Sequence, residues 1–149
     1  MKSVRIGLLI LLVVFAGIQF IPAKRNLSDE IPTADFMAVY DVPERIESIL
    51  KTACYDCHSD NTYYPWYSKI QPVAWFLGDH IEEGKAELNF NAFGNYSDRR
   101  KTSKLRSIKS QVEEGKMPLA SYTWMHENAK LSEADKNTLI TWVNELMDN

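Results

Sequence analysis

The feature that most constrains this chain is the run Cys54-Tyr-Asp-Cys57-His58, because it contains the only two cysteines among 149 residues. Two cysteines form one bridge at most, so a fold held together by several disulfides is excluded. A Cys-x-x-Cys-His run is the covalent attachment site of c-type haem. Two thiols on one helical turn reach the two vinyl groups of a porphyrin edge, and the adjacent imidazole then lies beside the iron. The spacing therefore predicts one covalently bound haem c, attached to Cys54 and Cys57, with His58 as the proximal iron ligand.

Three other uses of the two cysteines compete with this interpretation. A thioredoxin-like redox pair needs a strand-helix-strand context, and the residues before Cys54 do not have the pattern of a strand. A structural zinc site needs four ligands, whereas His80 and His126 lie far apart in the sequence. A disulfide between Cys54 and Cys57 is awkward on a helix and leaves His58 unexplained. Haem is the favoured interpretation.

The distal iron ligand is less constrained by the sequence. The candidates are Met117, Met125, Met37, His80 and His126. Met117 is favoured because it follows Gly115, where a helix is expected to end, and precedes Pro118, which favours an extended backbone. It lies 59 residues after His58, in a segment that can cross the far face of the haem. The main rival is His80, which is on an apolar helix face where a histidine is more often a core residue than a ligand.

The N-terminus has the pattern of an exported protein. Lys2 and Arg5 precede the 16 residues Ile6 to Ile21, in which Gln19 is the only strongly polar side chain. This run is long for a cleaved signal peptide and a little short of the ~20 residues that cross a bilayer comfortably. Because no Ala-x-Ala site follows, we favour an uncleaved transmembrane anchor over a cleaved signal. We therefore expect the domain at the periplasmic face of a bacterial inner membrane, or free in the periplasm if the segment is removed.

Apolar residues recur at helical spacing in the rest of the chain, which predicts an all-α domain with no sheet. Residues 1–21 are the anchor or signal, 22–41 a tether, and 42–149 the domain. The expected helices begin at Pro43, Pro72, Ser97 and Ser132. The first of them includes both cysteines at its C-terminal end. Ser97 is a candidate N-cap, Gly115 a helix stop, and Ser132 with Asp135 a capping box.

The charges are unevenly distributed. The first 25 residues contain no acid, so the remainder has 13 of the 17 basic residues and all 20 acidic ones. This acidic body disfavours a nucleic-acid partner, because binding to a duplex depends on neutralising phosphates with Lys and Arg. The basic run from Arg99 to Lys109 is interpreted as a solvated helix face, with a docking patch for an acidic redox partner as the alternative.

The order of these features resembles a small monohaem cytochrome c, and several segments resemble the bacterial haem-binding domain family of exported cytochrome c-like proteins. The segments are Cys54-Tyr-Asp-Cys-His-Ser, Tyr64-Pro-Trp-Tyr-Ser, Asp79-His-Ile-Glu-Glu-Gly, Glu87-Leu-Asn-Phe, Met117-Pro-Leu-Ala-Ser-Tyr and Ala129-Lys-Leu-Ser. The resemblance covers roughly residues 42 to 147 and implies covalent haem c in a cytochrome c-like fold.

The ligands set the expected function. With His58 and Met117 both bound, the iron has no open position, and the protein passes single electrons to redox partner proteins. The alternative is a haem-based sensor of gas or peroxide, or a minor peroxidase, with a weakly held distal ligand and His80 as an acid or base. An electron carrier is favoured over a catalyst.

Overall fold

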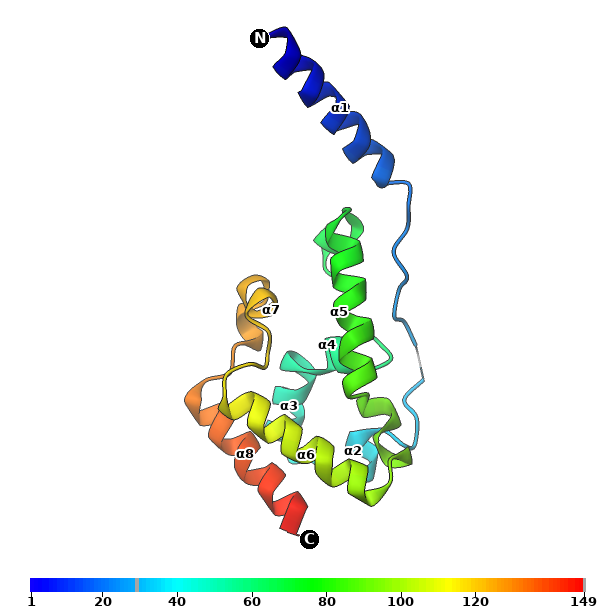
Figure 1. Ribbon diagram of the computed structural model, residues 1–149. Coiled ribbons are helices and arrows are strands. Elements are labelled where there is room, and N and C mark those ends of the chain that lie inside the picture. The colour runs from blue at the N-terminus through cyan, green and yellow to red at the C-terminus, as the bar shows by residue number, and fades with distance from the viewer. Residues whose placement is uncertain (29, 149) are drawn as a thin grey trace.

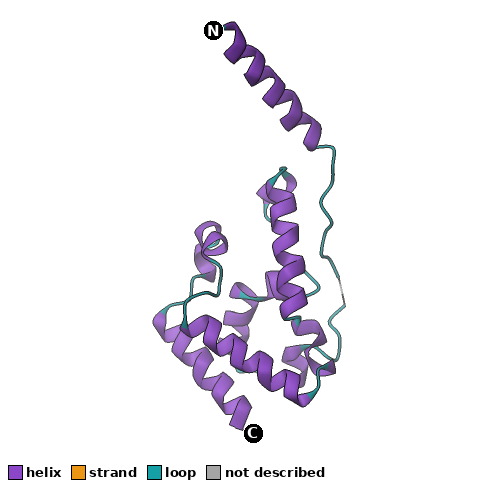
Figure 2. Ribbon diagram, in the orientation of Figure 1, coloured by secondary structure: helices purple, strands orange, loops and turns teal. Residues whose placement is uncertain are grey.

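The computed structural model describes residues 1–28 and 30–148, and every regular element in those ranges is a helix (Figures 1 and 2). This confirms the all-α prediction. The α-helices are α1 (Lys2–Ile18), α2 (Phe36–Val39), α3 (Glu44–Ala53), α4 (Tyr55–His58), α5 (Val73–Glu87), α6 (Asp98–Glu113), α7 (Ala120–Met125) and α8 (Glu133–Asp148). Short 3-10 turns are η1 (Trp66–Lys69), η2 (Phe90–Asn95) and η3 (Glu127–Ala129).

The predicted helices correspond to α3, α5, α6 and α8. The capping box at the start of α8 is confirmed: the Asp135 N–H donates to Ser132 Oγ at 3.1 Å, and the Ser132 N–H donates to Asp135 Oδ2 at 3.2 Å. Gly115 follows α6 with a positive φ of 65°, which confirms it as the helix stop. Ser97 is at the N-cap of α6 as predicted, but its side chain makes no capping hydrogen bond.

The prediction that the first helix runs through both cysteines is wrong. Helix α3 ends at Ala53, Cys54 leaves the helical region with φ −129° and ψ −45°, and α4 is a separate turn. The apolar face of α3 is buried in the core, whereas the first residue of α4, Tyr55, stacks on Phe90 with ring centroids 4.8 Å apart. The chain bends at Cys54 because these two contacts draw α3 and α4 along different directions.

An aromatic cluster forms the centre of the core. The ring of Phe36 packs edge-on against Phe93 at 4.7 Å, Phe90 at 5.2 Å and Trp142 at 5.8 Å between centroids. Such arrangements are the preferred geometry of aromatic pairs. Phe36 is in α2, so this part of the predicted tether packs against the core of the domain.

Helix α1 is exposed along its length and projects from one end of the domain (Figure 1). Its end is held by Gln71, whose N–H donates to Gln19 Oε1 at 2.9 Å and whose Nε2 donates to the Ile21 carbonyl at 2.8 Å. Among the described residues, no helix has both the length and the apolar character needed to cross a membrane. The 17 residues of α1 extend about 26 Å, less than the ~30 Å of a bilayer core, so the predicted transmembrane helix is not found.

Candidate functional site

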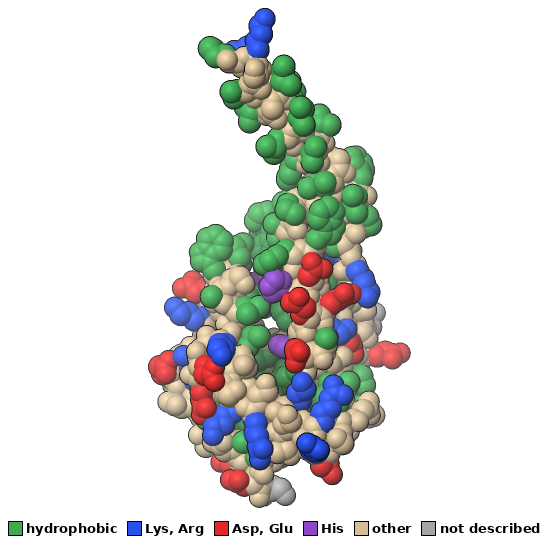
Figure 3. Space-filling model, in the orientation of Figure 1, with side chains coloured by type: hydrophobic (Ala, Val, Ile, Leu, Met, Phe, Trp, Pro, Cys, Tyr) green, Lys and Arg blue, Asp and Glu red, His purple; other side chains and the backbone are tan. Residues whose placement is uncertain are grey.

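Three adjoining cavities, here called the attachment groove, surround the Cys-x-x-Cys-His run. The inner cavity, of about 300 Å³, and the middle cavity, of about 290 Å³, share Cys54, His58 and Met117 in their walls. The outer cavity, of about 350 Å³, shares Cys57 and His80 with the middle one. Figure 3 shows histidine side chains at a hollow in this face of the domain, between α5 and α7. The groove thus brings the predicted attachment residues and both favoured distal candidates together.

The imidazole of His58 has a defined orientation. Its Nδ1 lies 2.9 Å from the carbonyl oxygen of Gly84 and 3.0 Å from that of Leu88. Because carbonyl oxygens only accept, Nδ1 carries the hydrogen, and Nε2 is left as the nitrogen available to a metal. The C-terminal end of α5 supplies both carbonyls, and helix ends have carbonyls without intrahelical partners.

Gly84 sets the distance between α4 and α5. A Cβ built on Gly84 would lie 2.9 Å from the carbonyl oxygen of Cys57, closer than real Cβ atoms approach. The two helices therefore touch at backbone distance, which is what allows His58 to reach the end of α5. The sequence pattern did not predict this role of Gly84. The available signal is a glycine inside a helix, where alanine has the higher helix propensity.

Both cysteines are free thiols and half-buried. Burial, with a smaller effect of neighbouring Cys57, raises the pKa of Cys54 to about 12, and burial together with the Asp56 charge raises the pKa of Cys57 to about 11. Redox-active cysteines have lowered pKa values instead. Helix α3 precedes Cys54, where a thioredoxin-like site would have a strand. No group of three or more His, Cys, Asp or Glu side chains able to hold a metal occurs in the described part of the chain.

Tyr55, the first residue between the cysteines, ties the run to the core. Its hydroxyl donates to Asp35 at 3.1 Å, and Asp35, which is buried, also accepts from Asn91 Nδ2 at 2.8 Å. Burial and the Asp35 charge raise the pKa of the Tyr55 hydroxyl, so it remains a hydrogen-bond donor. Sequence reasoning treated this position as a spacer, because the contacts join residues 20 or more positions apart.

Asp56, the second residue between the cysteines, binds the segment that follows Met117. Its Oδ2 accepts from the Tyr122 hydroxyl at 2.7 Å, and its Oδ1 accepts from the Tyr63 N–H at 3.1 Å. Tyr122 is in α7, and its pKa is raised mainly by burial and by the hydrogen bond to Asp56. Through this bond, Asp56 holds α7 and the loop before it against the cysteine run. Nothing in the sequence pattern signalled the pairing.

Met117 and His80 enter the groove from different elements. Met117 lines the inner and middle cavities with Cys54 and His58, and its N–H donates to the Gln111 carbonyl at 3.1 Å. His80 lines the middle and outer cavities with Cys57. Its Nδ1 lies 2.9 Å from the carbonyl of Phe76 in the preceding helical turn, so its Nε2 is the nitrogen free for other partners. Met117 is the candidate that shares more of the groove with His58.

The other three distal candidates are used elsewhere. The Nε2 of His126 is hydrogen-bonded to the Tyr67 hydroxyl at 2.6 Å, and its ring stacks on Tyr122 at 4.3 Å. Met37 packs against the core cluster. Met125 reaches the outer cavity but is 45% exposed. None of the three lines the inner or middle cavity with His58.

Comparison with known proteins assigns the family. Residues 13–145 match the family described as a haem-binding domain. The chain belongs to the haem-binding domain family. No curated protein and no solved structure matches the chain significantly. The family supports haem as the cofactor, and it confirms the resemblance inferred from the cysteine run and the Met117 segment.

The groove of this haem-binding domain offers the donors that haem requires. Two thiols and an imidazole with a defined tautomer line one wall. Leu88 and Phe90 add apolar surface to the inner cavity, and the ring of Phe90 packs edge-on against His58 with centroids 6.2 Å apart. Lys104 and Gln111 add polar groups at the α6 side. A macrocycle with an apolar body and acidic substituents matches this combination.

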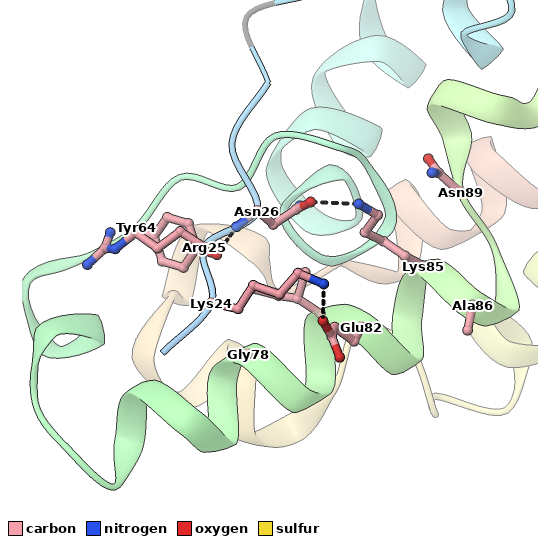
Figure 4. Close-up of a pocket in the computed structure, with 10 residues that line it drawn as sticks. Lys24, Arg25, Asn26, Tyr64, Gly78, Glu82, Lys85, Ala86 and Asn89 are labelled. Carbon is pink, nitrogen blue, oxygen red and sulfur yellow. Dashed lines mark hydrogen bonds and ion pairs between the residues drawn. The ribbon is translucent and has the colours of Figure 1, made fainter. Parts of the chain in front are cut away.

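A fourth cavity of the haem-binding domain, about 380 Å³, has different chemistry. It lies where residues 24–26 run beside Gly78, Glu82 and Lys85 of α5 (Figure 4). Its charged and polar groups bind one another: Lys24 pairs with Glu82 at 2.8 Å, and Lys85 donates to Asn26 Oδ1 at 2.6 Å. These contacts fasten the chain after α1 to the domain.

Proposed function

We propose that this haem-binding domain is a monohaem c-type cytochrome that transfers single electrons. Cys54 and Cys57 hold the haem covalently, and His58 binds the iron through Nε2. The observation that carries the proposal is the fixed His58 imidazole, with Nδ1 held by the Gly84 and Leu88 carbonyls, in a groove that also contains both thiols. When bound, haem supplies an iron that accepts and releases one electron.

The residues around His58 keep the site rigid through the redox change. Hydrogen bonds from Nδ1 to backbone carbonyls raise the basicity of the imidazole and fix its plane. The absence of a side chain at Gly84 lets α4 and α5 pack at backbone distance. Tyr55 and Asp56 attach the cysteine run to the core and to α7. A site that changes little in shape exchanges electrons with little reorganisation.

We assign the distal position to Met117. Its place beside Cys54 and His58 in two cavities supports this assignment, and the Asp56–Tyr122 bond and the Gln111 carbonyl hold its loop. An imidazole and a thioether together leave no iron position open, and the thioether favours the reduced state. Electron transfer, rather than binding of a small molecule, follows from that pair.

The packing of α3 on α8 supports a cytochrome c-like fold. The two helices are in contact, and the faces that they bury include Ile46 and Leu50 on α3 and Trp142 and Val143 on α8. In such a fold the helix before the haem attachment residues packs across the final helix. The proposed haem would complete the core on the side of the groove.

We place the protein in the bacterial periplasm with redox proteins as partners and no nucleic acid. The basic residues Lys2 and Arg5 followed by the apolar α1 support export, and haem c is attached outside the cytoplasm. The acidic composition of the domain opposes binding to phosphate backbones.

A sensor or minor peroxidase is the second candidate function. It is favoured by His80, which lies in the middle cavity with Cys57 and Glu83 and has Nε2 free for other partners. In this case the distal position opens, and His80 supplies an acid or base there.

The visible spectrum of the haem-loaded protein separates the two functions. We expect the oxidised protein to show the weak far-red band of methionine bound to iron, and Met117→Ala to abolish it. When both proteins are reduced, carbon monoxide should bind readily to the Met117→Ala variant and not to the original chain. His80→Ala is the matched control and should leave the spectrum unchanged. Loss of the low-spin spectrum in His80→Ala, with Met117→Ala unaffected, would contradict the assignment.

A further inference from the structure

Residues 99–112, the basic run of α6, contain no acidic residue. Three other segments without acidic residues are residues 1–28, 61–78 and 117–126. These three segments contain the basic residues Lys2, Arg5, Lys24, Arg25 and Lys69. On a chain with a net charge of −3, residues 1–28 and 61–78 therefore have only basic charged side chains, and residues 117–126 have no charged Lys, Arg, Asp or Glu.

The three segments meet at one end of the molecule. The C-terminal end of α1, the start of α5 and helix α7 lie in one half of the domain, and α6 and α8 lie in the opposite half (Figure 1). The hydrogen bonds between Gln19 and Gln71 join the first two segments, and the outer cavity is lined by both α5 and α7. Figure 3 shows apolar side chains over this end and over α1, with most charged side chains on the rest of the face.

Large aromatic and aliphatic side chains are exposed at this end. We call this group the aromatic end: Trp124 is 84% exposed, Tyr63 77%, Trp66 72%, Phe76 58%, Met125 45% and Val73 41%. A contiguous apolar patch of this kind marks an interaction surface. Trp and Tyr in particular are enriched where proteins meet the headgroup region of a bilayer, because their rings are apolar and their N–H or O–H groups are polar.

We propose that the aromatic end docks on a lipid bilayer that carries anionic headgroups. The patch continues the apolar surface of α1, whose side chains are exposed all round. Arg25 and Lys69 lie near this end and attract anionic lipids, whereas Lys2 and Arg5 lie at the far tip of α1. Acidic side chains begin further along α5, at Asp79 and at Glu82, which is paired with Lys24. Lipid therefore matches both the apolar and the charged character of this end.

The docking has a consequence for the groove. The outer cavity is lined by Phe76, Trp124 and Met125 of the aromatic end and also by Cys57. With the aromatic end on the bilayer, the Cys57 side of the groove faces the membrane surface. The α6 side of the groove, at Lys104, then faces away from it.

Hydrogen exchange of the full chain with vesicles tests the proposal. We expect vesicles of phosphatidylcholine mixed with phosphatidylglycerol to slow amide exchange in peptides from residues 63–77 and 119–126. Pure phosphatidylcholine vesicles should give a much smaller effect. The measurement does not depend on haem. It therefore tests membrane docking even if the electron-transfer proposal fails.

Substitutions separate the aromatic end from α1, which is unchanged in every variant. Trp124→Glu and Trp66→Glu should each weaken vesicle binding roughly tenfold. The matched control is Ile31→Glu, since Ile31 is 83% exposed and lies outside the aromatic end. It should bind as the original chain does, and circular dichroism should give the same helix content for all three variants.

Three results would overturn the proposal. Protection confined to α1, with Trp124→Glu binding as tightly as Ile31→Glu, would mean that α1 alone contacts lipid. Protection of the aromatic end that grows with protein concentration in the absence of vesicles would assign the surface to a second copy of the chain. Equal protection on neutral and anionic vesicles would remove the role of the basic residues.

Discussion

The hydroxyl of Tyr122 donates a 2.7 Å hydrogen bond to the carboxylate of Asp56, and this bond joins two walls of the attachment groove that are 66 residues apart in sequence. Asp56 lies between the two cysteines, and Tyr122 lies five positions after Met117. The position of the proposed distal ligand is thereby tied to the position of the attachment residues. The cysteine run therefore forms one wall of the groove and, through Asp56, also holds the opposite wall that contains Met117.

Removal of this bond should loosen the Met117 loop. We expect Tyr122→Phe to lose about 1–2 kcal/mol of unfolding free energy, because the carboxylate loses a charge-assisted partner. Azide should bind to the oxidised haem faster, since the loop opens more often. Denaturant unfolding and stopped-flow mixing measure the two effects. Tyr67→Phe, which removes a hydroxyl that bonds to His126, is the control, and an equal acceleration in both variants would contradict a specific role of Tyr122.

The thiols of Cys54 and Cys57 should hold the haem covalently. Protein produced in a host that attaches haem c should keep its haem through denaturing electrophoresis, because thioether bonds survive unfolding. Cys54→Ala should leave one attachment and a weaker haem stain, and the double alanine variant should leave none. A colourless product that contains zinc would sink the haem assignment.

The close contact at Gly84 should be intolerant of a methyl group. In Gly84→Ala the new Cβ meets the Cys57 carbonyl oxygen at 2.9 Å, so α4 and α5 must separate. We expect a loss of roughly 1–3 kcal/mol of unfolding free energy and a shifted midpoint potential, because the His58 hydrogen bonds lengthen.

Gly78→Ala is the matched control for Gly84→Ala on the same helix. Its Cβ would have an ordinary 3.8 Å contact with the Lys24 carbonyl oxygen, and alanine has the higher helix propensity. We expect this variant to gain up to about 1 kcal/mol of stability and to keep the original potential. A potential that moves equally in both variants would show that Gly84 has no special effect on His58.

The capping box of α8 should make stability depend on pH. The hydrogen bond from Ser132, opposed by partial burial and helped by Arg45, lowers the pKa of Asp135 below its ordinary 3.8. A lowered pKa in the folded state means that the stabilisation is present above pH 3.8 and is lost as the pH falls through the folded-state value. Asp135→Ala should therefore cost about 1 kcal/mol at neutral pH and much less in strong acid. Urea unfolding at neutral pH and in strong acid measures the loss of stability in Asp135→Ala. A loss that is the same at both would refute the prediction.

The basic run of α6 should act as a solvated helix face. Lys101, Lys104 and Lys109 lie 3.7–3.8 Å from carboxylates of neighbouring residues, and the Arg100 guanidinium lies 4.1 Å from the centroid of the Tyr96 ring. Because these charges already have partners, reduction by an acidic redox protein should depend only weakly on ionic strength. A steep dependence, reduced by Lys104→Ala, would instead favour the docking patch.

The sequence by itself determined the chemistry and the local elements. The cysteine run specified the cofactor class, since two thiols and a histidine at this spacing serve few other purposes. Apolar periodicity located α3, α5, α6 and α8. The glycine after α6 and the box at Ser132 marked helix ends correctly, because caps and turns depend on residues within one or two turns of each other.

Only the tertiary structure decided how these elements make a site. Four features depend on contacts between residues that are distant in sequence. They are the bend at Cys54, the carbonyls that hold His58, the backbone contact at Gly84 and the hydrogen bond between Asp56 and Tyr122. Burial of Phe36 brought part of the predicted tether into the core for the same reason. Periodicity describes which face of a helix is apolar, but packing against other elements decides what that face meets. The cofactor class could therefore be inferred from five residues, whereas the groove that would hold it required the whole fold.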